Sequence, residues 1–85
     1  MRLVFTPNAW ADYTHRLTAD RAMLERINRL IDEALRDPFE GIGKPEPLRH
    51  AFAGCWSRRI SEEHRLVYLV DDEDIVIHQA RYHYK

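Results

Sequence analysis

A histidine, a glutamate and several arginines in the second half of the chain are residue types that can cleave a phosphodiester bond. His83 lies between two tyrosines near the end of the chain, and Glu46 lies between two prolines. An imidazole titrates near neutral pH, so together with a carboxylate it can serve as an acid/base pair. Arg58, Arg59 and Arg65 fall on predicted strands and supply cations for the charge on a phosphate. This combination predicts acid/base cleavage of a phosphodiester.

Each of these side chains also has a purely structural interpretation, which residue type and spacing leave open. His83 would then be a tail residue near a frayed chain end, Glu46 a polar loop residue, and the arginines exposed strand residues. The two prolines favour a role for Glu46, because they fix φ on either side and reduce the entropy lost on ordering the loop. Trp56 and Tyr68 are interpreted as core residues, not as platforms for stacked bases.

The composition indicates one small globular domain, spanning residues 1–85, in a reducing compartment. Its 85 residues leave no room for a second core, and the 45% share of apolar residues is ordinary for a folded chain. The single cysteine, Cys55, excludes an internal disulfide, and the histidines lack metal-ligand spacing. No segment resembles a signal peptide or a membrane span, so we expect a cytoplasmic protein with no metal site and no membrane contact.

The charges of the chain are unevenly distributed. The net charge of −1 excludes a polycation that binds nucleic acid indiscriminately. Between residues 44 and 68 basic side chains outnumber acidic ones, and an acidic cluster follows at residues 71–74. We therefore expect a local basic docking surface, although a solvated surface of mixed charge would have the same composition.

The first half of the chain predicts a strand followed by two helices. Residues 2–5 form a short apolar strand, and Thr6-Pro7 is a helix-start signal, a hydroxyl N-cap before a proline. Residues 18–20 interrupt the helical pattern, and a second, longer amphipathic helix runs to about Arg36. Asp37-Pro38 ends that helix, and the glycines and prolines of residues 39–47 predict a stiffened irregular loop.

The second half predicts an antiparallel meander. Four strands are expected, at residues 48–50, 55–60, 64–70 and 75–82, joined by turns short enough for hairpins. The resulting class is α+β, with two N-terminal helices packed on one face of a mainly antiparallel sheet and the other face free. Strand alternation places Arg65 with Val67 and Leu69, separates Arg58 from Arg59, and is expected to orient His83 at the end of the last strand.

Several motifs are spread along the whole chain. They are residues 38–41 (Pro-Phe-Glu-Gly), 43–48 (Gly-Lys-Pro-Glu-Pro-Leu), Gly54, 56–60 (Trp-Ser-Arg-Arg-Ile), 63–68 (Glu-His-Arg-Leu-Val-Tyr) and 81–84 (Arg-Tyr-His-Tyr). Together they resemble the YoeB (Txe) family of bacterial toxins, part of the RelE-like superfamily, with nearly gapless spacing. The resemblance implies the family's microbial-ribonuclease-like fold and an endoribonuclease, independent of metals and cofactors, that cleaves mRNA in the ribosomal A site and inhibits translation.

The resemblance also implies a role for each candidate residue. Glu46 would be the general base, His83 the general acid, and Arg65 the cation that stabilises the phosphoryl oxygens. Further RNA or phosphate contacts are implied for four residues: Lys44, Arg49, Arg59 and Tyr84. Arg49 stands where relatives often carry lysine, so a planar fork replaces a point charge. RNA supplies its own nucleophile, the 2′-hydroxyl, and the expected products are a 2′,3′-cyclic phosphate and a 5′-hydroxyl.

The partners implied by the resemblance are the ribosome with its mRNA, a neutralising antitoxin of the YefM/Phd type, and operator DNA reached only through the antitoxin complex. It also allows a homodimer, whose interface no sequence feature fixes. The alternative function is a non-catalytic module that binds the ribosome or operator and acts as a translation blocker or corepressor. Such a module needs no Glu46/His83 pair. DNA binding by the chain alone is disfavoured, because helix 20–36 mixes its arginines with acidic residues.

Overall fold

Two helices follow the first strand, and each begins at a side-chain cap. The computed structural model describes residues 1–82 and contains α1 (Pro7–Ala19) and α2 (Arg21–Arg36). The Thr6 hydroxyl accepts the amide hydrogen of Ala9 at 3.1 Å, which confirms the predicted cap. Asp20 ends α1 and starts α2, its carboxylate accepting the amide hydrogen of Met23 at 3.1 Å. Neither helix is long and apolar enough to cross a membrane.

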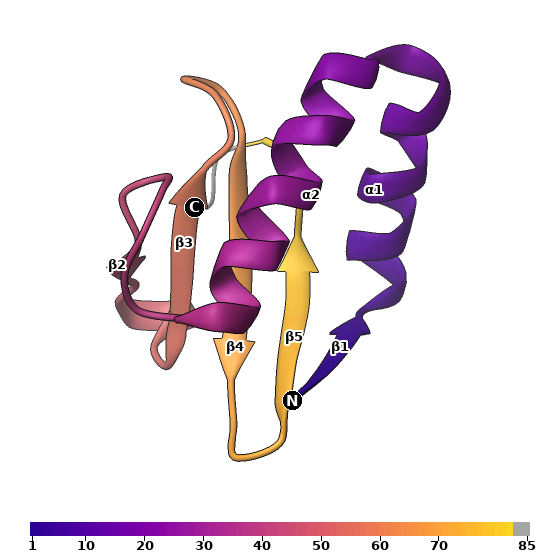
Figure 1. The fold of residues 1–85 in the computed structure, drawn as a ribbon. Helices are drawn as coiled ribbons and strands as arrows, with labels where there is room; N and C mark the ends of the chain where they lie inside the picture. Colours follow the sequence, from indigo (N-terminus) through magenta and orange to yellow (C-terminus); the bar gives the residue numbers. More distant parts are fainter. Residues whose placement is uncertain (83–85) are drawn as a thin grey trace.

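The strands form one mixed sheet of five strands (Figure 1). They are β1 (Arg2–Phe5), β2 (Glu46–Pro47), β3 (Cys55–Arg59), β4 (Arg65–Val70) and β5 (Asp74–Gln79). Their order is β1-β5-β4-β3-β2, with β1 parallel to β5 and the other pairs antiparallel. The predicted α+β class with a mainly antiparallel sheet is confirmed, and the parallel pairing places the first strand beside the last.

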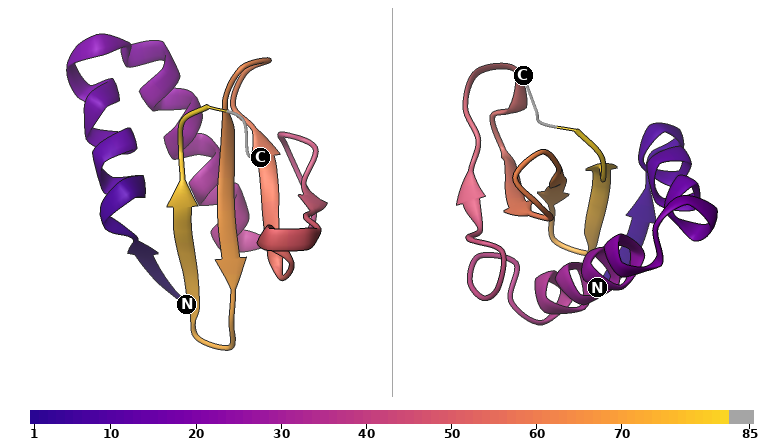
Figure 2. Two further views of the ribbon diagram at one scale, coloured as in Figure 1. Left: turned by 180° about the vertical axis from the view of Figure 1, so that it is seen from behind. Right: turned by 90° about the horizontal axis from the view of Figure 1, so that it is seen from above.

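Both helices lie on the same side of the sheet, and no helix covers the other side (Figure 2). The core between the layers contains Ile27 and Leu30 of α2, packed with Leu66 and Tyr68 of β4 and with Ile77 of β5. All five are inaccessible to solvent. Burying an aliphatic side chain of this size contributes about 1.5–3 kcal/mol, so this layer is the main source of stability. We call the opposite side the open face.

Two predicted strands have different bounds in the structure. The strand expected at residues 48–50 is wrong: the paired residues are Glu46 and Pro47, and a 3₁₀ turn, η1 (His50–Phe52), follows. Pro47 has no amide hydrogen to donate, which suits the edge of a sheet. The last strand ends at Gln79 because the side-chain amide of this residue donates to the carbonyls of Arg81 at 2.7 Å and Tyr82 at 3.0 Å, which holds the chain in a bend. Strand alternation therefore cannot orient the residues beyond Gln79.

Candidate active site

The register of three strands brings three of the predicted site residues, Glu46, Arg59 and Arg65, onto the open face. Glu46 lies opposite Ser57, and Ser57 lies opposite Val67. Two residues nearer the turn that joins β3 to β4, Arg59 lies opposite Arg65. Since side chains alternate across a strand, all these residues point to the same side of the sheet. The prediction that at most one of Arg58 and Arg59 shares a face with Arg65 is confirmed by the register, and the structure shows that this residue is Arg59.

The spacing between Glu46 and Arg65 suits an intervening phosphate. The two residues are separated by two strand spacings of ~4.8 Å and by two residues of ~3.4 Å along the strand, which places their Cα atoms ~12 Å apart. A Cα separation of this size leaves room for a phosphate between the two side chains. Glu46 is exposed and makes no ion pair with any residue that the structure describes.

Arg65 is anchored by the turn between β3 and β4. Its Nη1 donates to the carbonyls of Ser61, Glu62 (3.1 Å) and His64 (3.0 Å). Its Nε and Nη2 have no hydrogen-bond partner within residues 1–82, and only 8% of the residue is exposed. Nε and Nη2 lie side by side on one edge of the guanidinium and can bind two oxygens of one anion. The side chain is thus fixed through one nitrogen, and no residue in the range 1–82 occupies its bidentate edge.

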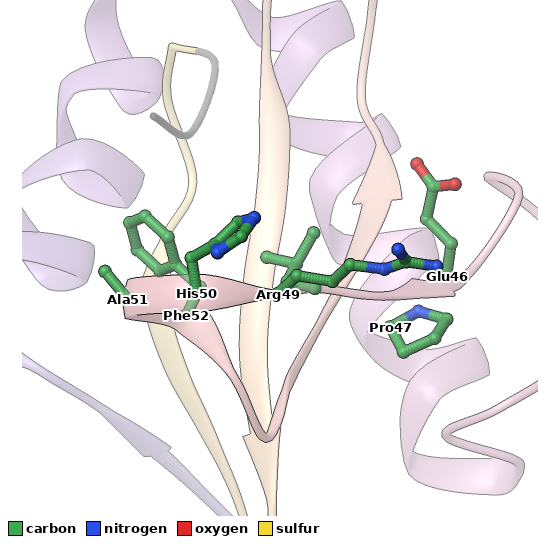
Figure 3. A pocket seen from close by; sticks show the side chains of 7 residues that line it. Glu46, Pro47, Arg49, His50, Ala51 and Phe52 are labelled. Carbon is green, nitrogen blue, oxygen red and sulfur yellow. The ribbon is translucent and has the colours of Figure 1, made fainter.

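The segment that contains Glu46 also forms a cavity. Residues 46–52 line a hollow of about 360 Å³ beside β2. Figure 3 shows the Arg49 side chain running along this segment toward Glu46, with the His50 ring nearby. Arg49 and His50 are both exposed, and His50 adopts a positive φ of 58° where the chain enters η1. This arrangement brings the predicted binding residue Arg49 to the same region as the predicted base.

Lys44 and Arg59 are exposed and make no side-chain contact that would neutralise them within the described residues. The backbone around them is held firmly: the Arg59 amide donates to the Gly43 carbonyl at 2.6 Å, and Arg26 of α2 donates to the Arg59 carbonyl at 3.2 Å. Gly43 has a φ of +85°, and a Cβ there would lie 2.7 Å from the Leu30 side chain. Glycine is therefore required where the loop before β2 passes between α2 and β3.

His83 and Tyr84, the predicted general acid and a predicted RNA contact, lie outside the described residues. The described chain leads up to them: the Tyr82 carbonyl accepts a hydrogen bond from the Arg65 amide at 2.9 Å. The residue that precedes His83 is therefore bonded to the backbone of the residue that presents the guanidinium.

Arg58 does not belong to the site, although it is one of the strand arginines that the sequence singles out. It lies on the helix-covered face and is fully buried. Its Nε donates to the Tyr68 hydroxyl at 2.9 Å, and that hydroxyl donates to the Pro38 carbonyl at 2.7 Å. Its terminal nitrogens donate to three loop carbonyls, those of Asp37 (2.6 Å), Glu40 (2.8 Å) and Ile42 (3.0 Å).

These hydrogen bonds of Arg58 were not predicted from the sequence, although strand alternation could have indicated its burial. Arg58 has the same parity as the apolar residues Trp56 and Ile60, so its side chain must enter the core layer. A buried guanidinium requires several acceptors, and the irregular loop 37–42 supplies them as carbonyl groups. Arg58 therefore fixes the loop that leads to Lys44 and Glu46.

The other reactive side chains indicate no second centre. Cys55 is half-buried, and burial raises the pKa of its thiol, which disfavours the nucleophilic thiolate. Tyr68 is buried and belongs to the core, as expected. Residues 1–82 contain no group of three or more histidine, cysteine, aspartate or glutamate side chains that could hold a metal ion.

The acidic cluster lies at the other end of the sheet. Asp71 and Glu73 belong to the turn that joins β4 to β5, opposite the turn that holds Arg65 (Figure 1). Hydrogen bonds from the amides of Glu73 and Asp74 lower the pKa of the Asp71 carboxyl, so this end of the molecule stays negatively charged at neutral pH. The acidic cluster is therefore at the opposite end of the sheet from Arg65.

Comparison with known proteins agrees with the motifs over nearly the whole chain. Residues 5–84 match the family described as YoeB-like toxin of bacterial type II toxin-antitoxin system. The chain is 56% identical to Toxin YoeB of Streptomyces coelicolor over 84 residues, which cover 99% of this chain and 100% of the relative.

Solved structures agree as well. A YoeB/ParE toxin from Agrobacterium tumefaciens superposes with a TM-score of 0.96 at 49% identity, covering 99% of this chain and 100% of the other. Two Staphylococcus aureus structures, a heterotetrameric YoeB-YefM complex (TM-score 0.90) and a YoeB dimer (0.91), are each 45% identical and cover 99% of this chain and 98% of theirs.

Proposed function

Because the chain belongs to the YoeB-like toxins of bacterial type II toxin–antitoxin systems, we propose that it is a ribosome-dependent endoribonuclease that cleaves mRNA in the A site and stops translation. The observation that supports this function best is the open face itself. The register of three paired strands supports it, because Glu46 and Arg65 share this face with Arg59 between their positions. A surface built only for binding has no need of a carboxylate among its cations.

The proposed reaction uses the 2′-hydroxyl of the RNA as nucleophile. Glu46 accepts the hydroxyl proton as the oxygen attacks the adjacent phosphorus. The guanidinium of Arg65 donates from Nε and Nη2 to the two nonbridging oxygens, where negative charge increases in the transition state. His83 protonates the departing 5′-oxygen, and the products are a 2′,3′-cyclic phosphate and a 5′-hydroxyl. Arg49, Arg59, Lys44 and Tyr84 bind neighbouring phosphates or bases. The proposed reaction requires no metal or cofactor.

The weak net charge offers a reason for dependence on the ribosome. A protein of net charge −1 gains little from counterion release on free RNA. The ribosome supplies a docking surface and holds the message in an orientation suited to attack, which lowers the entropic part of the barrier. This function requires a cytoplasmic location, where ribosomes and messages are.

We further propose that an antitoxin of the YefM type neutralises the chain. The S. aureus relative was solved with YefM in a heterotetramer, and a relative was also solved as a dimer. An antitoxin segment that folds on the cationic open face would cover Arg59 and the edge of Arg65, and it would exclude RNA. Operator DNA would then be contacted by the complex and not by this chain alone.

An in vitro translation reaction followed by primer extension tests the function. The wild type is expected to cut the message at the A-site codon, whereas Glu46→Ala, Arg65→Ala and His83→Ala each lose about 10²–10⁴-fold in cleavage rate. Glu25→Ala, which removes an exposed carboxylate of α2 far from the open face, serves as the matched control. Cleavage by His83→Ala at the wild-type rate would remove that residue from the mechanism. A wild type that stalls ribosomes without cutting would favour the non-catalytic module.

A chemical control isolates the nucleophile. A message with a single 2′-deoxy nucleotide at the cleaved position is expected to resist cleavage, because it lacks the attacking hydroxyl. Cutting at that position would show that water attacks instead. Free mRNA cut at physiological salt as efficiently as ribosome-bound mRNA would contradict the role given to the ribosome.

A further inference from the structure

The backbone immediately before His83 is held by a second histidine, His64. The Nδ1 atom of His64 accepts the amide hydrogen of Tyr82 at 2.7 Å. The rings of the two residues lie 5.8 Å apart at an angle of 51°. His64 is 18 residues away in sequence and directly precedes Arg65, so it connects the turn that holds Arg65 with the segment that leads to His83.

Both backbone polar groups of Tyr82, the amide and the carbonyl, are hydrogen-bonded. Its amide donates to His64, while its carbonyl accepts from the Arg65 amide at 2.9 Å and from the Gln79 side chain at 3.0 Å. Its φ of 63° lies in the left-handed region, which costs a residue with a side chain about 1–3 kcal/mol. The hydrogen bonds oppose this cost, and the loss of one of them would favour a different path for the chain.

His64 is itself fixed in place. Its amide donates to the Ser61 hydroxyl at 3.2 Å, and its carbonyl accepts the amide hydrogens of Ile60 at 3.0 Å and Ser61 at 3.2 Å, as well as Nη1 of Arg65. Its ring position is thus determined by the β3–β4 turn, the same turn that orients the Arg65 guanidinium. A single turn thus positions both the phosphate-binding edge and the backbone that leads to the general acid.

The hydrogen bond to Tyr82 requires one protonation state of His64. Nδ1 can accept only when it carries no hydrogen, so the ring must be neutral with its proton on Nε2. Burial lowers the pKa of His64 most, and Arg16 lowers it further. Glu63 opposes this in part, and Arg81 and Arg65 add smaller decreases. The three cations approach from α1, from the segment after β5 and from β4 itself.

Arg16 strengthens this preference for the neutral ring. It is only 6% exposed, and its Nε and Nη2 have no hydrogen-bond partner in the part of the chain that the structure describes. Its charge is therefore poorly compensated close to the imidazole, and a protonated His64 would add a second unfavourable charge.

We propose that His64 is a positioning residue for RNA cleavage, which holds the Tyr82 backbone through Nδ1 and so orients the chain directly before the proposed general acid. The inference rests on the proposed nuclease function and adds to it a residue that touches neither RNA nor the reacting atoms. It differs from a purely structural role of His64 in the β3–β4 turn, which would affect folding but not the rate of the chemical step.

Two substitutions distinguish the effect of the hydrogen-bond acceptor of His64 from the effect of its ring. His64→Phe keeps a ring of similar size against Tyr82 but has no acceptor, whereas His64→Asn places an amide oxygen where Nδ1 lies and cannot titrate. His15→Phe, at an exposed position of α1, is the matched control. Each purified variant is assayed on ribosomes programmed with a defined message, in single-turnover experiments at varied ribosome concentration.

His64→Phe is expected to cleave about 10- to 100-fold more slowly at saturation, with little change in half-saturating ribosome concentration, since a displacement of about 1 Å can cost 10²-fold. His64→Asn is expected to recover most of this loss, and His15→Phe to match the wild type. A His64→Phe variant that cleaves at the wild-type rate overturns the inference. Equal loss in the Phe and Asn variants also overturns it, because the acceptor would then not be the group that matters.

The pH profile gives a second, independent readout. The hydrogen bond from the Tyr82 amide to His64 is present above the ordinary histidine pKa of ~6.5. It is lost as pH falls through the lowered pKa of His64. The wild-type cleavage rate should therefore show an acidic limb, set by protonation of His64, that His64→Asn lacks. An identical acidic limb in both proteins contradicts the inference.

Nuclear magnetic resonance tests the contact without activity and serves if His64→Phe does not fold. The wild type should show the Nε2–H tautomer of His64 and slow exchange of the Tyr82 amide hydrogen, both lost on acidification, and His64→Asn should keep the slow exchange. A His64 ring protonated on Nδ1 at neutral pH overturns the inference. If the wild type does not cut RNA at all, the proposed nuclease function fails. If the wild type cuts and His83→Ala does not, while His64→Phe is unaffected, only this inference fails.

Discussion

Arg58 and Arg59 are adjacent in β3, yet they lie in two regions of opposite character. Arg58 points to the helix-covered face, is fully buried and has all three of its nitrogens hydrogen-bonded. Arg59 points to the open face and is exposed, and its guanidinium has no partner among the described residues. One residue step along a strand thus separates a structural cation from a cation available to a ligand.

The two faces of the sheet therefore have different roles. On the covered face polar groups satisfy one another, so that the loop after α2 is held against β3. On the open face Glu46 and Arg59 have no such partners among residues 1–82, and both are exposed, so their charges remain solvated. A surface of unpaired charges beside a rigid layer is suited to binding a charged substrate, because the groups need little rearrangement before the reaction.

Removing the buried guanidinium should have the largest effect. Arg58→Met keeps much of the side-chain volume but leaves the Tyr68 hydroxyl and three loop carbonyls without a donor, and we expect a loss of about 3–5 kcal/mol in the free energy of unfolding. For a domain whose total stability is about 5–15 kcal/mol, the variant would be close to unfolding. Urea denaturation followed by circular dichroism measures the change.

Arg59→Met is the matched control for this change and should shift the free energy of unfolding by less than about 0.5 kcal/mol. Equal destabilisation by the two substitutions would contradict the division between the faces.

On the open face the expected effect concerns activity and not stability. Glu46→Gln keeps shape and hydrogen bonding but removes the base, and the cleavage rate should fall about 10²–10⁴-fold while the urea midpoint stays unchanged. Glu25→Gln on α2 should leave both quantities unchanged. If Glu46→Gln unfolds the protein, the carboxylate has a structural role that the open-face interpretation excludes.

A single hydroxyl on the covered face should have an intermediate effect. Tyr68→Phe removes both the acceptor for Arg58 and the donor to Pro38, and about 1–3 kcal/mol of stability should be lost. Tyr13→Phe removes a hydroxyl bonded to exposed Asn28 at 2.7 Å, where water can replace the partner, and should cost much less. Comparable losses in thermal denaturation of the two variants would argue against the importance of burial.

The smallest effect is expected for an ion pair at the edge of the open face. Arg2 and Asp74 are joined at 2.8 Å between β1 and β5, and Arg2 is exposed. Water and salt screen such a pair, so Arg2→Met should leave the urea midpoint unchanged within error at 0.15 M salt. A clear destabilisation that persists at high salt would show that the pair holds β1 in register.

Local signals predicted the helices well. Thr6-Pro7, Asp20 and Asp37-Pro38 act within a few residues of the helix ends, and the helices begin and end there. The same kind of reasoning was wrong at residues 48–50, because the pairing of Glu46 with Ser57 depends on a distant strand and η1 depends on an unusual backbone at His50. Reasoning by alternation failed beyond Gln79 for a similar reason, since hydrogen bonds from this side chain end the strand.

The sequence by itself determined which residues can do chemistry, the two helices and the alternation along β3 and β4. Only the tertiary structure decided which face the helices cover and which carbonyl groups bind the buried Arg58. It also decided that β1 pairs with β5, 72 residues later, and that His64 meets Tyr82. Helix caps and strand alternation depend on residues that are close in sequence. The covered face of the sheet and the contacts between distant segments depend on which surfaces exclude water from each other.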